Sequence, residues 1–134
     1  LKGEFMAYES SFRGGIQVAA GNLNYGAKAS QDEIIVSPGA GRQPQVRIFS
    51  AKGRLLSSFS AFNDNFRQGF SIALSDIDNN GLPEIVASAG PGGGPQVRIF
   101  NALGDLRQSW YVYSQAYEGG VNAAALNLNK QYFN

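Results

Sequence analysis

The residues best suited to hold a metal ion lie together in one short stretch, residues 76–84. Oxygen-bearing side chains occupy positions 1, 3, 5 and 9 of this stretch: Asp76, Asp78, Asn80 and Glu84. Calcium prefers about six to eight hard oxygen ligands, which a tight loop of alternating carboxylates and amides supplies. Gly81 permits a sharp turn at position 6, and Leu82 at position 7 offers its backbone carbonyl. The spacing therefore predicts a Ca²⁺ site on this loop.

The stretch differs from an EF-hand in two ways. Ala87 stands at position 12, where an EF-hand has a bidentate glutamate, and the flanking residues predict strands rather than helices. The alternative is a hairpin turn rich in Asn, Asp and Gly that binds no ion. The position of the loop between two strands of a repeated unit favours the calcium interpretation.

Two other loops hold weaker versions of this pattern. The candidate ligands of the first are Asn22, Asn24, Asp32 and Glu33. This loop also contains a three-residue insertion (54 − 51) and places the cation Lys28 where a metal would bind. The second loop, residues 127–131, lacks both carboxylates and the glycine. Neutral amides bind calcium more weakly than carboxylates, so we predict that these two loops bind little or no metal.

A sequence repeat positions the three loops. The segment Pro44–Phe49 returns unchanged as Pro95–Phe100, displaced by 51 residues (95 − 44). The segment 66–70 matches 117–121 at the same displacement. A fixed period near 50 residues indicates one supersecondary unit copied in tandem, and such a unit cannot bury its apolar face alone. The predicted repeats are residues 1–54, residues 55–105 and a partial copy at residues 106–134.

Each complete repeat predicts four short strands. In the second copy, alternating, β-branched or aromatic runs predict strands at residues 70–74, 84–88, 97–100 and 106–113. Turn residues separate these runs, and no stretch holds a helical period. The predicted fold class is therefore all-β, with four-stranded antiparallel propeller blades of about 51 residues. Residues 1–8 are predicted as a leading outer strand and residues 121–126 as a trailing inner strand. Two complete blades are too few to close a propeller, which needs about four to eight.

The turns and strands also contain glycines and arginines at special positions. The turn before each third strand recurs at one displacement, as Gly39/Gly90, Gly41/Gly92 and Pro44/Pro95, so we expect Gly92 or Gly94 to need a positive φ. No Lys-Ser/Thr follows this turn, which argues against a phosphate loop. Arg47 and Arg98 occupy the same strand position of successive repeats, so we predict that each pairs with carboxylates or carbonyls between blades. Arg42, in the equivalent turn of the first copy, is predicted to be solvated.

Composition excludes several classes of function. The 134 residues include no Cys and no His, which removes disulfides, thiolate or imidazole metal sites, and Cys-His or Ser-His catalysis. The net charge of +1, with acids and bases interspersed, predicts no nucleic-acid partner. No apolar run approaches the ~18 residues of a membrane span. No catalytic pair of residues emerges, so the chain is predicted not to be an enzyme.

The motifs together resemble a known family, the FG-GAP/VCBS repeat. The likeness covers nearly the whole chain and rests on three motifs of the second copy: Phe66-Arg67-x-Gly69, the loop 76–84, and Gly90–Phe100. These repeats build the propeller heads of integrin α subunits and of many bacterial secreted and surface proteins. The resemblance implies an extracellular or cell-surface module that carries calcium on the loop 76–84.

Three functions are compatible with this resemblance. The first is a non-enzymatic propeller module that binds a protein or polysaccharide and is stiffened by calcium. The second is a structural building block whose incomplete blades are completed by neighbouring copies or by further blades of a parent chain, in a ring or fibre. The third is a carbohydrate-active enzyme or a lectin accessory domain, because propellers also host lyases and lectins.

Overall fold

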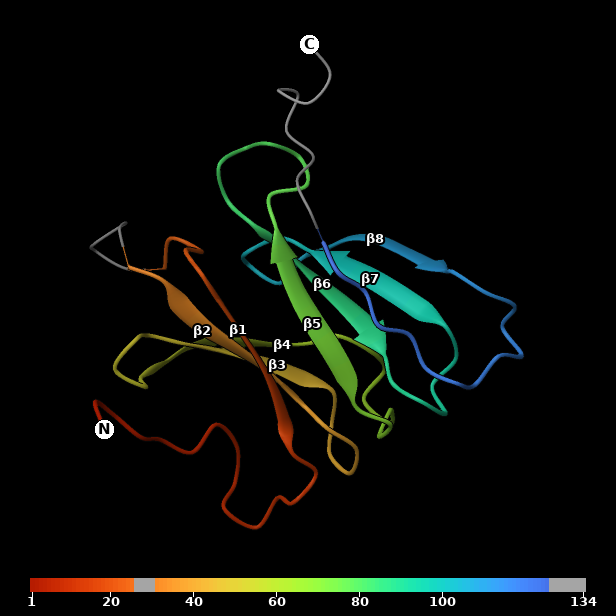
Figure 1. The fold of residues 1–134 in the computed structure, drawn as a ribbon, viewed down its shortest axis with the longest axis horizontal. Helices are drawn as coiled ribbons and strands as arrows, with labels where there is room; N and C mark the ends of the chain where they lie inside the picture. The colour runs from red at the N-terminus through yellow and green to blue at the C-terminus, as the bar shows by residue number, and fades with distance from the viewer. Residues whose placement is uncertain (26–30, 126–134) are drawn as a thin grey trace.

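The computed structural model describes residues 1–25 and 31–125 (Figure 1). It contains eight strands: β1 (Ile16–Gly21), β2 (Glu33–Pro38), β3 (Gln45–Phe49), β4 (Leu55–Ser60), β5 (Phe70–Ser75), β6 (Glu84–Ala89), β7 (Gln96–Phe100) and β8 (Leu106–Tyr111). They form two antiparallel four-stranded sheets, ordered β1-β2-β3-β4 and β5-β6-β7-β8. The described residues contain no helix, and neither sheet closes on itself. The predicted all-β class and the four strands of the second copy are confirmed.

The two sheets repeat the same local geometry. In each, the third strand pairs with the fourth through a register shift, between Ile48 and Phe49 in the first sheet and between Ile99 and Phe100 in the second. The turn after each third strand contains a glycine with positive φ, a conformation that glycine adopts without steric cost. Identical residues in these hairpins thus fold identically, as the tandem repeat predicts.

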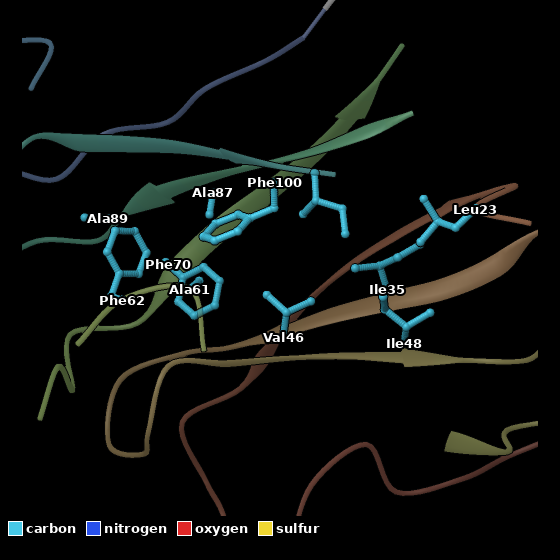
Figure 2. Packing of buried hydrophobic residues seen from close by; sticks show 11 residues of the cluster. Leu23, Ile35, Val46, Ile48, Ala61, Phe62, Phe70, Ala87, Ala89 and Phe100 are labelled. Carbon is cyan, nitrogen blue, oxygen red and sulfur yellow. The ribbon is translucent and has the colours of Figure 1, made fainter. Parts of the chain in front are cut away.

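The main core lies between the two sheets, and Figure 2 shows its side chains meeting across the gap. The first sheet contributes Ile35, Val46 and Ile48, and the second contributes Ile85 and Phe100, among others. Strand β5 contacts both β1 and β2, so the first strand of the second sheet runs along the first sheet.

Equivalent residues of the two repeats lie on the same side of their sheets. Ile48 faces the second sheet and is fully buried. Its counterpart 51 residues later, Ile99, belongs to a separate cluster with Val86 and Val97 on the far face of the second sheet. That cluster packs against the chain after β8, through residues 121–125. The equivalent face of each sheet therefore points the same way along the stack.

The predictions of a leading strand at residues 1–8 and a trailing strand at residues 121–126 are wrong. Residues 1–8 and residues 121–125 adopt no strand conformation, and residue 126 lies outside the described part of the chain. A strand needs a neighbour to complete its hydrogen-bond ladder, and neither segment has one among the described residues.

Both segments nevertheless lie where the repeat would place a strand. Phe5 packs on Phe49 as Phe59 packs on Phe100, with ring centroids 4.9 Å apart and planes at 47° in both pairs. At the other end, Val121, Ala123 and Ala125 pack against the outer cluster of the second sheet, as Phe70, Ile72 and Leu74 belong to or pack against the main core.

Candidate metal centre

The turn between β5 and β6 carries the predicted metal ligands. Ser75 at the end of β5 pairs with Glu84 at the start of β6, so the intervening residues form a closed loop. Asn79 and Gly81 have φ values of 60° and 93°, a left-handed conformation that asparagine and glycine adopt most easily. This pair of residues bends the loop back so that its two ends meet.

Three carboxylates converge in this loop. One oxygen from each of Asp76, Asp78 and Glu84 lies within 4.8 Å of the others. Asp76 is partly buried, Asp78 is exposed and Glu84 is 5% exposed. Three negative charges at this separation repel one another, and a divalent cation among them would remove the repulsion.

Backbone amides orient all three carboxylates, since Oδ1 of Asp78 accepts from the Asn80 amide at 3.1 Å. The two oxygens of Asp76 accept hydrogen bonds from the amides of Asn80 and Gly81, at 3.0 and 2.8 Å. Oε2 of Glu84 accepts from the Ile77 amide at 2.7 Å. The same Glu84 oxygen also accepts from the Asp78 amide at 3.4 Å, so backbone amides fix the direction in which these carboxylates point. The donor set consists of hard oxygens and fits calcium.

The other two predicted ligands occupy the same loop. Oδ1 of Asn80 accepts from the Leu82 amide at 2.8 Å, and its Nδ2 donates to Asp78 at 3.2 Å. These contacts place the Asn80 side chain beside the three carboxylates. Leu82 is partly buried at the return of the chain towards β6.

The first copy retains part of this arrangement. Oε2 of Glu33 accepts from the Leu23 amide at 2.7 Å, the same bond that Glu84 makes with Ile77. Glu33 thus takes the place of Glu84, although the spacing from Asn22 is three residues longer. Asn24 donates its amide to Oδ1 of Asn22 at 2.9 Å, and Asp32 is exposed next to Glu33. With amides in place of two carboxylates, this loop has one buried acid where the second copy has three converging ones.

Two sequence predictions for metal loops fall outside the described residues. Lys28 lies in the segment 26–30, and the third loop, residues 127–131, lies in the segment 126–134. The predictions for both remain predictions.

The repeated arginines bind backbone carbonyls, as predicted. Nη1 of Arg47 donates to the Ala7 carbonyl at 2.9 Å, and Nη1 of Arg98 donates to the Ala61 carbonyl at 3.1 Å. The prediction that Arg42 is solvated is wrong. Its side chain is 12% exposed and forms an ion pair with Glu9 at 3.1 Å, because the Tyr8 ring provides a surface on which the guanidinium stacks.

The sequence analysis did not predict the Arg42–Glu9 ion pair, nor the pocket that takes its place in the second copy. The aligned repeats carry a signal for both, because the second copy has Gly93 in place of Arg42 and Asn63 in place of Glu9.

Comparisons of the chain with protein families, with curated proteins and with solved structures find no match. No helix of the described residues has the length and apolar character needed to span a membrane.

Proposed function

We propose that this chain is a calcium-stabilised β-propeller segment of the FG-GAP/VCBS type that serves extracellular binding or scaffolding rather than catalysis. The observation that carries the proposal is the convergence of Asp76, Asp78 and Glu84 within 4.8 Å, in the turn of a repeated four-stranded sheet. Hard oxygen ligands of this kind favour Ca²⁺ over softer metals.

The packing of the sheets supports the propeller part of this proposal. Each sheet presents one face to the preceding element and the opposite face to the next, with the same repeat positions at each contact. A constant step between successive sheets closes into a ring when enough copies are present, and propellers use about four to eight.

A bound ion would stabilise the loop and the two strands that it joins. Extracellular calcium modules have dissociation constants of about 10⁻⁴–10⁻³ M. At about 1–2 mM free calcium, binding to the folded state alone then adds roughly 0.5–2 kcal/mol to the free energy of unfolding.

A calorimetric calcium titration, paired with thermal melts with and without the ion, tests this function. We expect one site in the parent chain and its loss in Asp78→Ala, whose exposed side chain can be removed without disturbing the core. Asn24→Ala changes the equivalent position of the first loop and should keep calcium uptake; because φ at Asn24 is 63°, which strains an alanine, this control is compared in the titration and not in the melts. No uptake by the parent, or undiminished uptake by Asp78→Ala, would refute the proposal.

A second candidate function, a building block that assembles with its own copies, has its own supporting observation. The far face of the second sheet carries Val86, Val97 and Ile99 and is covered by residues 121–125 alone among the described residues. Trp110 and Tyr113, at 42% and 63% exposure, line a hollow on this face together with Val86 and Val97.

The opposite face of the first sheet is the surface that a neighbouring copy would use. There Val36 and Phe49 pack beneath the segment that contains Tyr8. Docking of these two faces repeats the internal contact between the sheets and is heterologous, so it builds a ring or a fibre. Light scattering at micromolar concentration tests this function. A stable, well-folded monomer would exclude it.

A further inference from the structure

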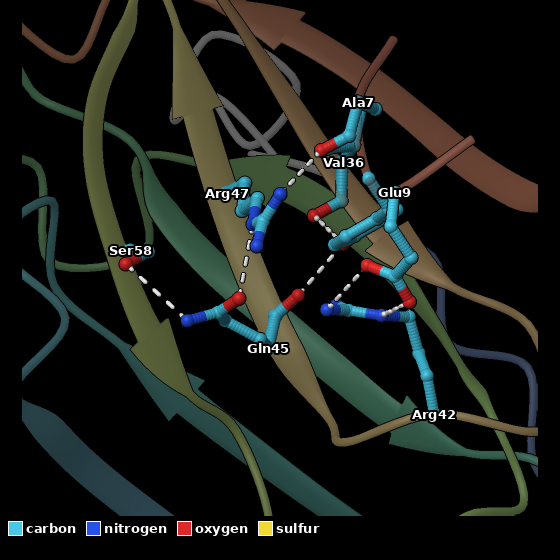
Figure 3. A network of polar contacts seen from close by, with 8 residues as sticks. Ala7, Glu9, Val36, Arg42, Gln45, Arg47 and Ser58 are labelled. Atoms are coloured by element: carbon cyan, nitrogen blue, oxygen red, sulfur yellow. Dashed lines mark hydrogen bonds and ion pairs between the residues drawn. The ribbon is translucent and has the colours of Figure 1, made fainter. Parts of the chain in front are cut away.

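The two copies differ at one place away from the loop 76–84. In the first copy it lies between the turn before β3 and the segment before β1, and in the second between the turn before β7 and the segment before β5. In the first copy the Arg42 side chain fills this space (Figure 3). Its Nε and Nη2 donate to the two Glu9 oxygens at 3.2 and 3.1 Å. Its guanidinium carbon lies 4.1 Å from the centroid of the Tyr8 ring and 5.9 Å from that of Phe12.

The second copy lacks both members of this pair. Gly93 stands at the position of Arg42, displaced by 51 residues, and Asn63 stands at the position of Glu9, displaced by 54. A pocket of about 330 Å³ lies there instead, a size within the usual range for small-ligand sites. Its lining includes Phe62, Asn63, Asn65, Phe66, Arg98 and Tyr111.

Arg98 gives the pocket a positive charge that no carboxylate balances. Among residues 1–25 and 31–125, Arg98 has no ion-pair partner, and its one acceptor is the neutral Ala61 carbonyl. Its Nε is buried without an acceptor, whereas Nε of the equivalent Arg47 donates to Gln45 at 2.9 Å. A guanidinium without an ion-pair partner favours an anionic ligand such as a carboxylate, which forms charge-assisted hydrogen bonds with arginine.

The remaining lining suits a ligand that also carries hydroxyl groups. Asn63 and Asn65 are exposed, and their side-chain amides make no hydrogen bond within the described part of the chain. The same holds for the Tyr111 hydroxyl. Each amide can donate and accept, as a sugar hydroxyl requires of its partner. Phe66 is partly buried, stacks on the buried Phe62 ring at 4.7 Å and 20°, and lines the pocket, so it provides an aromatic wall for the apolar face of a sugar ring.

We propose that this pocket binds a carboxylate-bearing sugar, such as a uronic acid residue of a polysaccharide. Arg98 would hold the carboxylate, the amides of Asn63 and Asn65 the hydroxyls, and Phe66 the ring. The proposal deepens the binding role proposed above and rests on it. It does not depend on the calcium loop, which is formed by residues 76–84.

Titration with monosaccharides, followed by NMR chemical shifts, tests the ligand class. We expect glucuronate or galacturonate to bind, and glucose to bind about tenfold or more weakly because the charge-assisted bond is lost. Acetate and a glutamate-rich peptide are the control ligands, because they carry carboxylates but no sugar ring. Binding of either one as strongly as the uronate would overturn the sugar assignment, and no uronate binding would overturn the site.

A double variant, Asn63→Glu with Gly93→Arg, rebuilds the ion pair of the first copy in the second. Gly93 has no positive φ, and an added Cβ would meet the Phe66 ring at 2.5 Å. Phe66 must therefore turn to the edge-on arrangement of Phe12, which lies 5.9 Å and 74° from Tyr8. We expect this variant to fold and to lose uronate binding. Unchanged binding would refute the proposal.

Milder variants keep the test valid if the double variant does not fold. Asn63→Ala and Tyr111→Phe change exposed groups, and each should weaken uronate binding severalfold while leaving the melting temperature unchanged. Asp78→Ala should leave uronate binding intact, so failure of the calcium proposal is distinguishable from failure of this one. Asn63→Ala and Tyr111→Phe variants that both bind as the parent does would count against the site.

Discussion

Replacing Ile48 and Ile99 separately by alanine should have different effects, although the two residues share their type, strand and repeat position. Ile48 is fully buried between the two sheets. Ile99 is 7% exposed and packs against residues 121–125, which form no strand. Comparing the two variants therefore tests whether the stability contributed by each isoleucine depends on the segment packed against it rather than on its position in the repeat.

The expected magnitudes follow from what surrounds each side chain. An isoleucine-to-alanine change removes three buried carbons, worth about 2.4 kcal/mol at about 0.8 kcal/mol each. At Ile48 two hydrogen-bonded sheets cannot collapse into the cavity, so a cavity term brings the cost to about 3.5–4.5 kcal/mol. At Ile99 the overlying segment can move inward, so we expect about 2 kcal/mol.

Urea unfolding of the parent and the two variants measures these costs, provided that the m-value is unchanged. The difference of about 1.5–2.5 kcal/mol in the free energy of unfolding is well above the error of the method. Equal costs at low protein concentration would refute the reasoning. Equal costs that appear only at high concentration would show that another copy covers Ile99, because association then stabilises that face.

Two further predictions concern the turns and the first sheet. Gly94→Val should cost more than about 1 kcal/mol, because φ at Gly94 is 76°, a backbone conformation that strains any L side chain. A Cβ at this position would meet nothing closer than the Tyr111 ring at 3.8 Å, so the Cβ itself does not clash. Gly3→Ala, with no positive φ and open space around it, should leave the melting temperature unchanged, and an equal effect of both variants would contradict the strain. Burial raises the pKa of Tyr8 above its ordinary value of 10.0. The neutral hydroxyl therefore contributes fully to the free energy of unfolding below pH 10, and this contribution is lost as the pH rises further. Tyr8→Phe should lose about 1 kcal/mol at pH 7, from the 2.7 Å bond to the Gln45 carbonyl, and should show a smaller fall in stability between pH 9 and 11; parallel alkaline profiles for the two proteins would exclude this role of Tyr8.

The strands, the turns and the convergence of carboxylates in the loop 76–84 could be predicted from the sequence because they depend on neighbours close in the chain. Alternating and β-branched residues predicted β5 to β8, and the expectation of a positive φ at Gly92 or Gly94 is confirmed at both, with φ values of 91° and 76°. The spacing of the loop 76–84 placed its oxygens on one turn, where Asp76, Asp78 and Glu84 converge. Local geometry determines each of these features.

Only the tertiary structure determined how equivalent residues of the two repeats differ in their surroundings. Identical residues at Ile48 and Ile99 have different surroundings, because a second sheet covers one and a strandless segment covers the other. Residues 1–8 have the residue types of a strand but no partner for a hydrogen-bond ladder, so they pack without forming one. Arg42 is partly buried because Tyr8 and Glu9, more than 30 residues away in the chain, lie against it. Composition and spacing define what a residue can contact, whereas only the packing of distant segments determines which contacts it makes.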